Sequence, residues 1–375
     1  MKTRWCWSGW IAVVALALTG CAAARHDCHR TADALDCYFP APPRSLPFDP
    51  FRTRVYSRTE LLNGFDTNAP DTYFSTPDWQ CYLLFKQTAA RKQAGNPDEI
   101  TARYMRLHDL SIEEALDRWL AETNQAGRRK VVGIMGDHAM ERCVFETGTN
   151  SDGVLTNGGY SPYMKLALLA HKLATNGFTV LTAGGPGAME AANLGAWMAG
   201  GTEADLTNAV HILSTVPQST NSGLWMRQSF LVLHQYRDIA HAENIGVPTW
   251  FYGFEPPNPF PTRIAKYFDN SLREDHLLAA SRSGIIFAPG NAGTVQEIFQ
   301  SACQNYYTSY AANRFPMVLF GVEYWNRQSS AGNHDKPAWP LLEQLGSEKQ
   351  FKPQLLISDD IDAIADFVCT NAVNQ

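Results

Sequence analysis

Short apolar runs alternate with longer stretches of mixed polarity through most of the chain after residue 126. The apolar runs, which predict buried strands, are Lys130–Met135, Phe178–Leu181, Val210–Leu213, Val247–Tyr252, Gly284–Ala288 and Met317–Gly321. The stretches with helical periodicity are Pro162–Asn176, Ala188–Met198, Thr262–Leu278, Val295–Thr308 and Ile361–Cys369. Strands that alternate with helices of about ten to fifteen residues indicate an α/β fold with a doubly wound, mostly parallel, Rossmann-like sheet.

The residues before this alternation form a different pattern. Residues 59–125 read as mostly helical, with the clearest amphipathic stretch at Ser111–Leu120, where Ser111 and Glu114 have the spacing of a capping box. Five prolines between Pro40 and Pro50 indicate a stiff, extended linker. We therefore expect a signal peptide (1–20), a tether and proline-rich linker (21–58), a helical N-terminal extension (59–125) and a Rossmann-like domain (126–375).

The first residues have the features of an export signal. Lys2 and Arg4 precede an apolar run at Trp10–Leu18, which is far shorter than the ~20 residues needed to span a bilayer. Leu18-Thr19-Gly20-Cys21 then resembles a bacterial lipobox, which implies lipidation of Cys21 and a lipid anchor in the cell envelope. Ala22 follows the cysteine, and in a Gram-negative cell this favours the periplasmic side of the outer membrane. The alternative is an ordinary secretory peptide cut near Ala22–Ala24.

An exported chain meets conditions in which disulfides form. Six cysteines remain once Cys6 and Cys21 are set aside, and their pairing cannot be derived from their spacing. Three of them, Cys143, Cys303 and Cys369, fall in apolar stretches of the predicted core. We expect these three to be buried thiols.

Composition narrows the class of ligand. Of the 375 residues, 45% are hydrophobic and 18% are charged, as in a globular protein. The formal net charge of −6 provides no basic excess to neutralise a polyphosphate backbone, so no nucleic acid polymer is expected as a partner. Small anions stay possible because backbone amides can bind them.

Two glycine-rich turns carry most of the functional information. The first, Ala183–Asn193, contains Gly184, Gly185 and Gly187, and the second, Pro289–Glu297, contains Gly290 and Gly293. Each lies between a predicted strand and a predicted helix, where backbone N–H groups and a helix N-terminus meet an anion. Neither has the glycine spacing of a dinucleotide fingerprint or the Gly-Lys-Ser/Thr of a P-loop. A tight structural turn is the alternative for each.

These turns resemble those of the LOG family of Rossmann-like proteins, often mislabelled lysine decarboxylases. The family pattern G-G-G-P-G-x-M-E-A-A-N-x-G-A is matched from Gly184 to Ala196, with Ala183 in place of the leading glycine. The pattern P-G-G-x-G-T-x-x-E is matched at Pro289–Glu297, with Asn291 in place of its second glycine. The resemblance covers roughly residues 130–310 and implies a homodimer that hydrolyses the N-glycosidic bond of nucleoside 5′-monophosphates.

The resemblance and the turn context together give a set of candidate ligand contacts. Gly136 and His138 follow the first predicted strand, and Arg142 lies close enough to reach a ligand as well, although a histidine in a turn is often structural. The residues expected to bind the nucleotide or its phosphate are Gly136, His138, Gly184, Gly185, Gly187, Met189, Glu190, Asn193, Gly290, Asn291, Gly293 and Thr294. Glu190 could instead be a first-turn acid that the helix dipole stabilises.

Arg273 and Glu297 are the candidate catalytic residues. Cleavage of an N-glycosidic bond builds positive charge on the ribose, so an ionised carboxylate at Glu297 would stabilise the transition state. An arginine stays charged and can clamp phosphate or assist departure of the base. The alternatives are structural: Glu297 closes a capping box that starts at Thr294, and Arg273 pairs with Glu274 or Asp275 on a solvated helix face.

Asn291 is the main departure from the family pattern. A residue with a side chain takes a left-handed φ only at a cost, which asparagine tolerates best among non-glycine residues. Its amide could donate to phosphate or narrow the pocket. Asn291 therefore supports the prediction of binding more firmly than that of turnover. The activity that the family resemblance implies is hydrolysis of purine nucleoside 5′-monophosphates such as AMP to free base and ribose 5-phosphate, and the alternative is a non-catalytic nucleotide- or phosphosugar-binding lipoprotein.

No cofactor or metal is expected for either function. A pyridoxal phosphate-dependent decarboxylase is excluded by the lysines, because Lys266 is the only one between Lys172 and Lys336 and no cofactor-site pattern surrounds it.

Overall fold

The computed structural model describes residues 46–122, 129–149, 155–252, 255–307, 314–326 and 335–372. The predicted signal peptide, the lipobox with Cys21 and most of the proline-rich linker lie outside the described residues. No helix within these ranges is both long enough and apolar enough to cross a bilayer.

A seven-stranded parallel sheet forms the centre of the fold, in the order β6-β5-β4-β1-β7-β8-β9. Its strands are β1 (Lys130–Met135), β4 (Phe178–Thr182), β5 (Asn244–Gly246), β6 (Arg263–Ile264), β7 (Ile285–Phe287), β8 (Met317–Phe320) and β9 (Leu355–Ser358). The chain adds β4, β5 and β6 on one side of β1, and then returns to place β7 on the other side. The doubly wound Rossmann-like prediction is confirmed, and the order reverses at β1, between β4 and β7.

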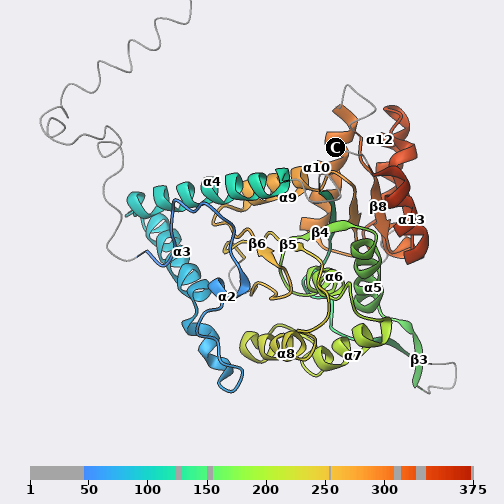
Figure 1. Ribbon diagram of the computed structural model, residues 1–375. Helices are drawn as coiled ribbons and strands as arrows, with labels where there is room; N and C mark the ends of the chain where they lie inside the picture. The colour runs from blue at the N-terminus through green and yellow to red at the C-terminus, as the bar shows by residue number, and fades with distance from the viewer. Residues whose placement is uncertain are drawn as a thin grey trace, which may run out of the picture.

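Helices cover both faces of the sheet (Figure 1). They are α5 (Pro162–Thr175), α6 (Ala188–Trp197), α7 (Glu203–Ser214), α8 (Ser222–Gln235), α9 (Asn270–Ala280), α10 (Ala292–Tyr307), α11 (Val322–Asn326), α12 (Trp339–Glu348) and α13 (Ile361–Asn371). Val132 and Ile134 of β1 point into one core, which α5, α6, α7 and α13 share. Val131 and Met135 point into the other core, with apolar residues of α9, α10 and α12. Each strand thus buries alternate side chains on opposite faces, as a sheet covered on both sides requires.

The N-terminal region is helical, as predicted, and packs at the β6 edge. It contains α2 (Arg58–Leu61), the 3₁₀ helix η1 (Pro70–Ser75), α3 (Pro77–Gln93) and α4 (Glu99–Ala121). The backbone of Tyr56 exchanges hydrogen bonds of 2.8 and 2.9 Å with Ile264 of β6. Asp78 accepts from Lys266 Nζ at 2.6 Å and from Trp250 Nε1 at 2.9 Å, all three side chains being buried. These contacts cover an edge strand that would otherwise expose unpaired backbone groups.

Three predicted elements differ in the structure. Val210–Leu213, predicted as a strand, belongs to α7, because its apolar residues extend the buried helix face of Leu206 and Ala209. The strand predicted at Val247–Tyr252 lies earlier in the chain, because β5 occupies Asn244–Gly246. Pro248, which has no N–H to donate, follows shortly after β5. The helix predicted from Thr262 starts only at α9, where the Asp269 side chain caps the N-terminus.

A separate antiparallel ribbon is formed by β2 (Phe145–Thr149) and β3 (Leu155–Tyr160). Two further predictions, the cap at Ser111 and the buried thiols, differ in the structure. Ser111 is no cap, because α4 already starts after Asp98, and its hydroxyl donates to the carbonyl oxygen of Pro50 at 2.9 Å. Of the three thiols predicted to be buried, Cys303 and Cys369 are exposed and Cys143 is half-buried. The helices that carry Cys303 and Cys369 bury other side chains in the core.

Candidate functional site

A cavity of about 480 Å³ opens at the carboxyl ends of the central strands. Its walls come from the end of β1, the first glycine turn, the segment after β5 and the first turns of α9 and α10. The lining residues are Met135, Gly136, Asp137, His138, Ala183, Gly185, Met189, Pro248, Thr249, Tyr252, Glu255, Arg273, Glu274, Asn291, Ala292, Gly293, Thr294 and Glu297. This is the place where ligands bind in open α/β sheets, beside the strand at which the order reverses.

Most of the residues expected from the sequence line this cavity. They are Gly136, His138, Gly185, Met189, Arg273, Asn291, Gly293, Thr294 and Glu297. Gly184, Gly187, Glu190, Asn193 and Gly290 are not among the lining residues. The sequence analysis missed Asp137, Tyr252, Glu255 and Glu274 as lining residues. Asp137 stands between two residues that it did select, and Glu274 follows Arg273, so adjacency was the available signal for both.

Both glycine turns hold the backbone at the end of β1. The carbonyl oxygen of Asp137 accepts from the N–H of Ala188 at 3.0 Å, and the N–H of Asp137 donates to the carbonyl oxygen of Pro289 at 3.1 Å. Gly187 has φ +69°, and a Cβ built on it would lie 2.3 Å from the Asp137 carbonyl oxygen. Only glycine fits a left-handed conformation this close to another backbone. Gly187 therefore contacts the backbone of Asp137 without lining the cavity itself.

A buried amide network fixes the rest of the first turn. Asn258 Nδ2 donates to the carbonyl oxygen of Gly185 and to Asn193 Oδ1, each at 3.0 Å. Asn193 Nδ2 in turn donates to Asn244 Oδ1 at 2.9 Å, and all three asparagines are fully buried. Asn193, expected at the ligand, instead holds the turn against β5. Its hydrogen-bonding capacity is used inside the protein, as buried polar groups require.

Glu190 is also directed into the interior. Arg142 Nε donates to Glu190 Oε2 at 2.7 Å and Arg142 Nη2 to Glu190 Oε1 at 2.5 Å, with both side chains essentially inaccessible. The hydroxyl of Tyr163 donates to Glu190 Oε2 at 2.9 Å and that of Ser229 to Glu190 Oε1 at 3.2 Å. The expectation that Glu190 and Arg142 face a ligand is therefore replaced by a bidentate, buried ion pair.

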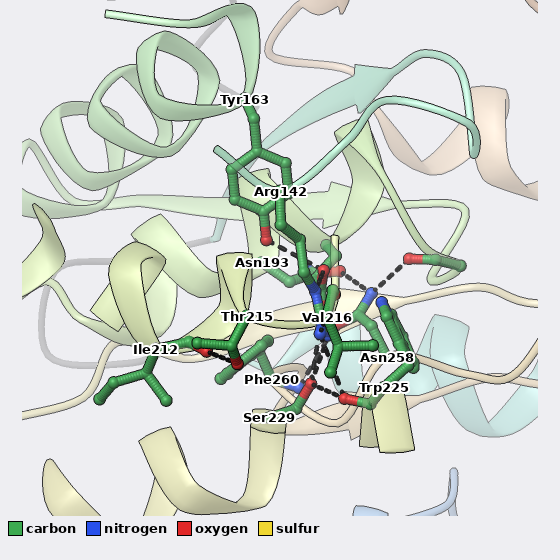
Figure 2. A network of polar contacts seen from close by, with 12 residues as sticks. Arg142, Tyr163, Asn193, Ile212, Thr215, Val216, Trp225, Ser229, Asn258 and Phe260 are labelled. Atoms are coloured by element: carbon green, nitrogen blue, oxygen red, sulfur yellow. Dashed lines mark hydrogen bonds and ion pairs between the residues drawn. The ribbon is translucent and has the colours of Figure 1, made fainter. Parts of the chain in front are cut away.

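The Arg142 guanidinium joins three parts of the chain. Figure 2 shows Tyr163 from α5 and Ser229 and Trp225 from α8 converging on it. Arg142 Nη1 donates to the carbonyl oxygens of Val216 and Trp225, both at 3.2 Å, and the guanidinium carbon lies 4.4 Å from the centroid of the Trp225 ring. Because Glu190 lies in the first turn of α6, this network fixes the helix that follows the first glycine turn.

The second turn has a different geometry from the one its motif suggested. Asn291 precedes α10, its carbonyl oxygen accepts from the N–H of Val295 at 3.1 Å, and its side-chain Nδ2 donates to Asp137 Oδ2 at 2.7 Å. Among the described non-glycine residues only Gln350 has a positive φ, so the expected left-handed strain at Asn291 is absent. Thr294 lies inside the helix, so the capping box expected between Thr294 and Glu297 does not form.

The two glycines of this turn have separate roles. A Cβ at Gly290 would lie 2.2 Å from Thr294 Oγ1, so Gly290 lets the first helical turn fold back on the loop. A Cβ at Gly293 would meet no protein atom within 4 Å, and Gly293 lines the cavity. Gly293 therefore leaves space on the ligand side of the helix N-terminus.

Arg273, Glu274 and Glu297 form a buried charged cluster in the cavity wall. Arg273 Nη1 lies 2.8 Å from Glu274 Oε2, Arg273 Nη2 donates to Asn270 Oδ1 at 2.6 Å, and the two charged side chains are each 6% exposed. Among the described residues Arg273 Nε has no hydrogen-bond partner. Arg273 therefore pairs with Glu274, but the pair is buried in the cavity wall and not on a solvated helix face.

Burial works against the ionised carboxylate expected at Glu297. It raises the pKa of Glu297 well above its ordinary value of 4.5, the charge of Glu274 and a hydrogen bond with it act in the same direction, and Arg273 partly opposes them. The cavity wall therefore contains two neighbouring carboxyl groups beside one arginine.

No protein-family model and no curated protein matches the chain. Solved structures do align with it. The molybdenum cofactor binding protein of the phototrophic bacterium Rippkaea orientalis is 13% identical, with a TM-score of 0.36 over 65% of this chain and 97% of that one. The molybdenum cofactor carrier protein of Chlamydomonas reinhardtii is 14% identical in one structure and 16% in another, each with a TM-score of 0.36 over 65% of this chain and 98% or 99% of that one. At this TM-score the likeness carries no argument about ligand or activity.

The raised pKa of Glu297 predicts a pH-dependent stability. Between pH 4.5 and the raised pKa, the folded protein holds a proton that the unfolded chain has released, so the free energy of unfolding falls as pH rises through this window. Glu297→Gln removes the titrating group. We expect the variant to gain stability relative to the wild type as thermal melts move from about pH 5 to pH 8. A difference in stability between variant and wild type that stays constant across this pH range would contradict the raised pKa of Glu297.

The buried ion pair predicts a large effect at Glu190. Glu190→Gln leaves the Arg142 charge buried without its partner, which typically costs about 3–5 kcal/mol of unfolding free energy. Urea denaturation measures the loss. Glu99→Gln, which breaks an exposed pair with Arg103, is the matched control and should change stability far less. If the two variants lose equal amounts, the Arg142 network does not hold α6 in place.

Proposed function

We propose that the cavity binds a nucleoside 5′-monophosphate or a related phosphosugar and hydrolyses its N-glycosidic bond, releasing the free base and ribose 5-phosphate. The observation that carries this proposal is the carboxyl pair of Glu274 and Glu297 beside Arg273, buried in the wall of a cavity at a helix N-terminus. Buried carboxyls with displaced pKa values at the ligand end of a parallel sheet are typical of sites that move protons.

The N-terminus of α10 supplies the phosphate contacts. The first N–H groups of a helix have no intrahelical acceptor, and here residues 292–294 line the cavity. Gly293 leaves the space in front of them open. The helix dipole and these donors favour an anion, and Arg273 Nε is a further buried donor without a partner among the described residues. Together they offset the acidic groups that line the same cavity.

The carboxyl pair supplies the chemistry at the sugar. As the bond between C1′ and the base nitrogen breaks, the base takes the bonding electrons and positive charge builds on the ribose. The ionised member of the Glu274–Glu297 pair stabilises that charge and accepts a proton from the water whose oxygen bonds to C1′. Because Arg273 balances the resting cluster, the negative charge is present at the site without a second unpaired carboxylate.

A second candidate function is binding without turnover. It is favoured by the ion pair between Arg273 and Glu274, which directs the guanidinium at a carboxylate of the protein. In that case the cavity holds its nucleotide or phosphosugar and releases it unchanged.

We also propose that the chain is anchored to the cell envelope through a lipid on Cys21 and that it forms a homodimer. The lipobox supports the anchor, and the LOG-like motifs support the dimer. A nucleic acid polymer is not part of this proposal, given the net charge of −6.

Glu297→Gln tests catalysis separately from folding and binding. Glutamine has the shape of the protonated carboxyl, so the variant should melt near or above the wild type and still bind AMP. It cannot share a proton with Glu274, and the rate of adenine release should fall on the order of 10²–10³-fold. Asp275→Asn is the matched control, since it removes a charge from the exposed face of the same α9 that carries Glu274, outside the cavity.

Two results would count against hydrolysis. An unchanged rate in Glu297→Gln would remove the carboxyl pair from the mechanism. A wild type that binds AMP but releases no base from any nucleotide in a panel would establish the binding function instead.

A further inference from the structure

Asp137, His138 and Glu255 also line the cavity and have no part in the mechanism so far. His138 Nδ1 lies 3.3 Å from Asp137 Oδ1 and 3.5 Å from Glu255 Oε1, so one ring nitrogen faces two carboxylates. The His138 side chain is 46% exposed, while those of Asp137 and Glu255 are 23% and 21% exposed. Because a carboxylate accepts hydrogen bonds and an N–H donates them, this arrangement favours a proton on Nδ1 of the ring.

Asp137 is held in place from three directions. Its Oδ2 accepts from Asn291 Nδ2 at 2.7 Å, its Oδ1 accepts from the N–H of Ala139 at 3.0 Å, and both glycine turns bond its backbone. The side chain of Asn291, which replaces a glycine of the LOG pattern, thus orients the carboxylate that orients His138. This resembles the arrangement in which a fixed carboxylate holds a catalytic imidazole by Nδ1 and leaves Nε2 to act.

Glu255 completes the environment of the imidazole. Burial raises the pKa of Glu255, and the positive charges of His138 and Arg273 partly oppose the rise. None of the described residues bonds to Nε2 of His138, and His138 lines the cavity together with Arg273, Glu274 and Glu297. The cavity therefore contains two separate sets of groups that can exchange protons, one after β1 and one on α9 and α10.

We propose, on the basis of the hydrolysis proposed above, that His138 is the general acid that protonates the departing base. In this step the bond between C1′ and the base nitrogen breaks, its electrons stay with the base, and the Nε2 proton of the imidazolium moves to a ring nitrogen of the base. Water bonds to C1′ and gives a proton to the Glu274–Glu297 pair. That proton returns to the now neutral His138 through solvent, so the net reaction consumes one water.

Substrates with different leaving groups test this role. Adenine needs a proton to leave AMP, whereas the nicotinamide of nicotinamide mononucleotide leaves as a neutral molecule without one. His138→Gln should therefore lower kcat for AMP by about 10²–10⁴-fold and leave kcat for nicotinamide mononucleotide within a few-fold of the wild type. Glu297→Gln should lower both. His234→Gln, a change of an exposed histidine on α8, is the matched control and should alter neither.

The pH profile of AMP cleavage gives a second readout that holds even if the cavity rejects nicotinamide mononucleotide. A step that uses a general acid slows once that acid is deprotonated, so the wild-type kcat should fall at alkaline pH and His138→Gln should lack this limb. An equal loss on both substrates, or an unchanged alkaline limb in the variant, would overturn the role of His138 while hydrolysis stands. Failure of the wild type to cleave either substrate would overturn both proposals.

Discussion

The backbone of Asp137 is the point on which the site depends. One glycine turn donates to its carbonyl oxygen and the other accepts from its N–H, so the end of β1 is fixed between the two loops that flank it in space. Gly187 makes this possible, because any side chain there would overlap the Asp137 carbonyl oxygen. The first glycine turn, which looks like a phosphate-binding loop, therefore acts largely as support. The second turn supports the same residue and also opens its helix N-terminus to the cavity.

The charged side chains of the cavity form two sets, each with two carboxyl groups and one basic side chain. Glu274 and Glu297 accompany Arg273, and Asp137 and Glu255 accompany His138. In the first set, burial and the neighbouring Glu274 raise the pKa of Glu297. In the second, the more exposed imidazole lies between two carboxylates. Both sets therefore place carboxyl groups next to a basic side chain in the wall of the same cavity.

The sequence was sufficient for β1, β4, β7 and β8, for the two glycine turns and for half of the residues that line the cavity, because these follow from local periodicity and from the backbone needs of single residues. It was insufficient where the same local sequence allows a side chain to face either the ligand or the protein interior. Glu190 follows a glycine turn whether its side chain faces a ligand or the protein interior. Its hydrogen bonds with Arg142, Tyr163 and Ser229, which are distant in the chain, direct the side chain into the interior. Val210–Leu213 is apolar enough for a strand, but it forms part of α7, where its apolar side chains pack in the same core as α5 and α6.

The capping box considered as the alternative for Glu297 does not form, because the motif fixes the order of residues and not the residue at which the helix begins. With α10 starting at Ala292, Asn291 takes the position before the helix and Glu297 turns toward Arg273 and Glu274. Glu255 carried no local signal, since it lies far from both motifs in the chain and reaches His138 only through the fold.

Titration calorimetry with AMP and adenosine tests the central claim most directly. If the N-terminus of α10 and Arg273 bind a 5′-phosphate, AMP should bind at least about tenfold more tightly than adenosine, through charge-assisted hydrogen bonds that the nucleoside cannot make. Gly293→Ala should melt at or above the wild type, because alanine favours the helix, and should lose most of this difference. Gly159→Ala, at a glycine with equally open surroundings outside the cavity, should keep it. Equal affinity for AMP and adenosine would contradict the account.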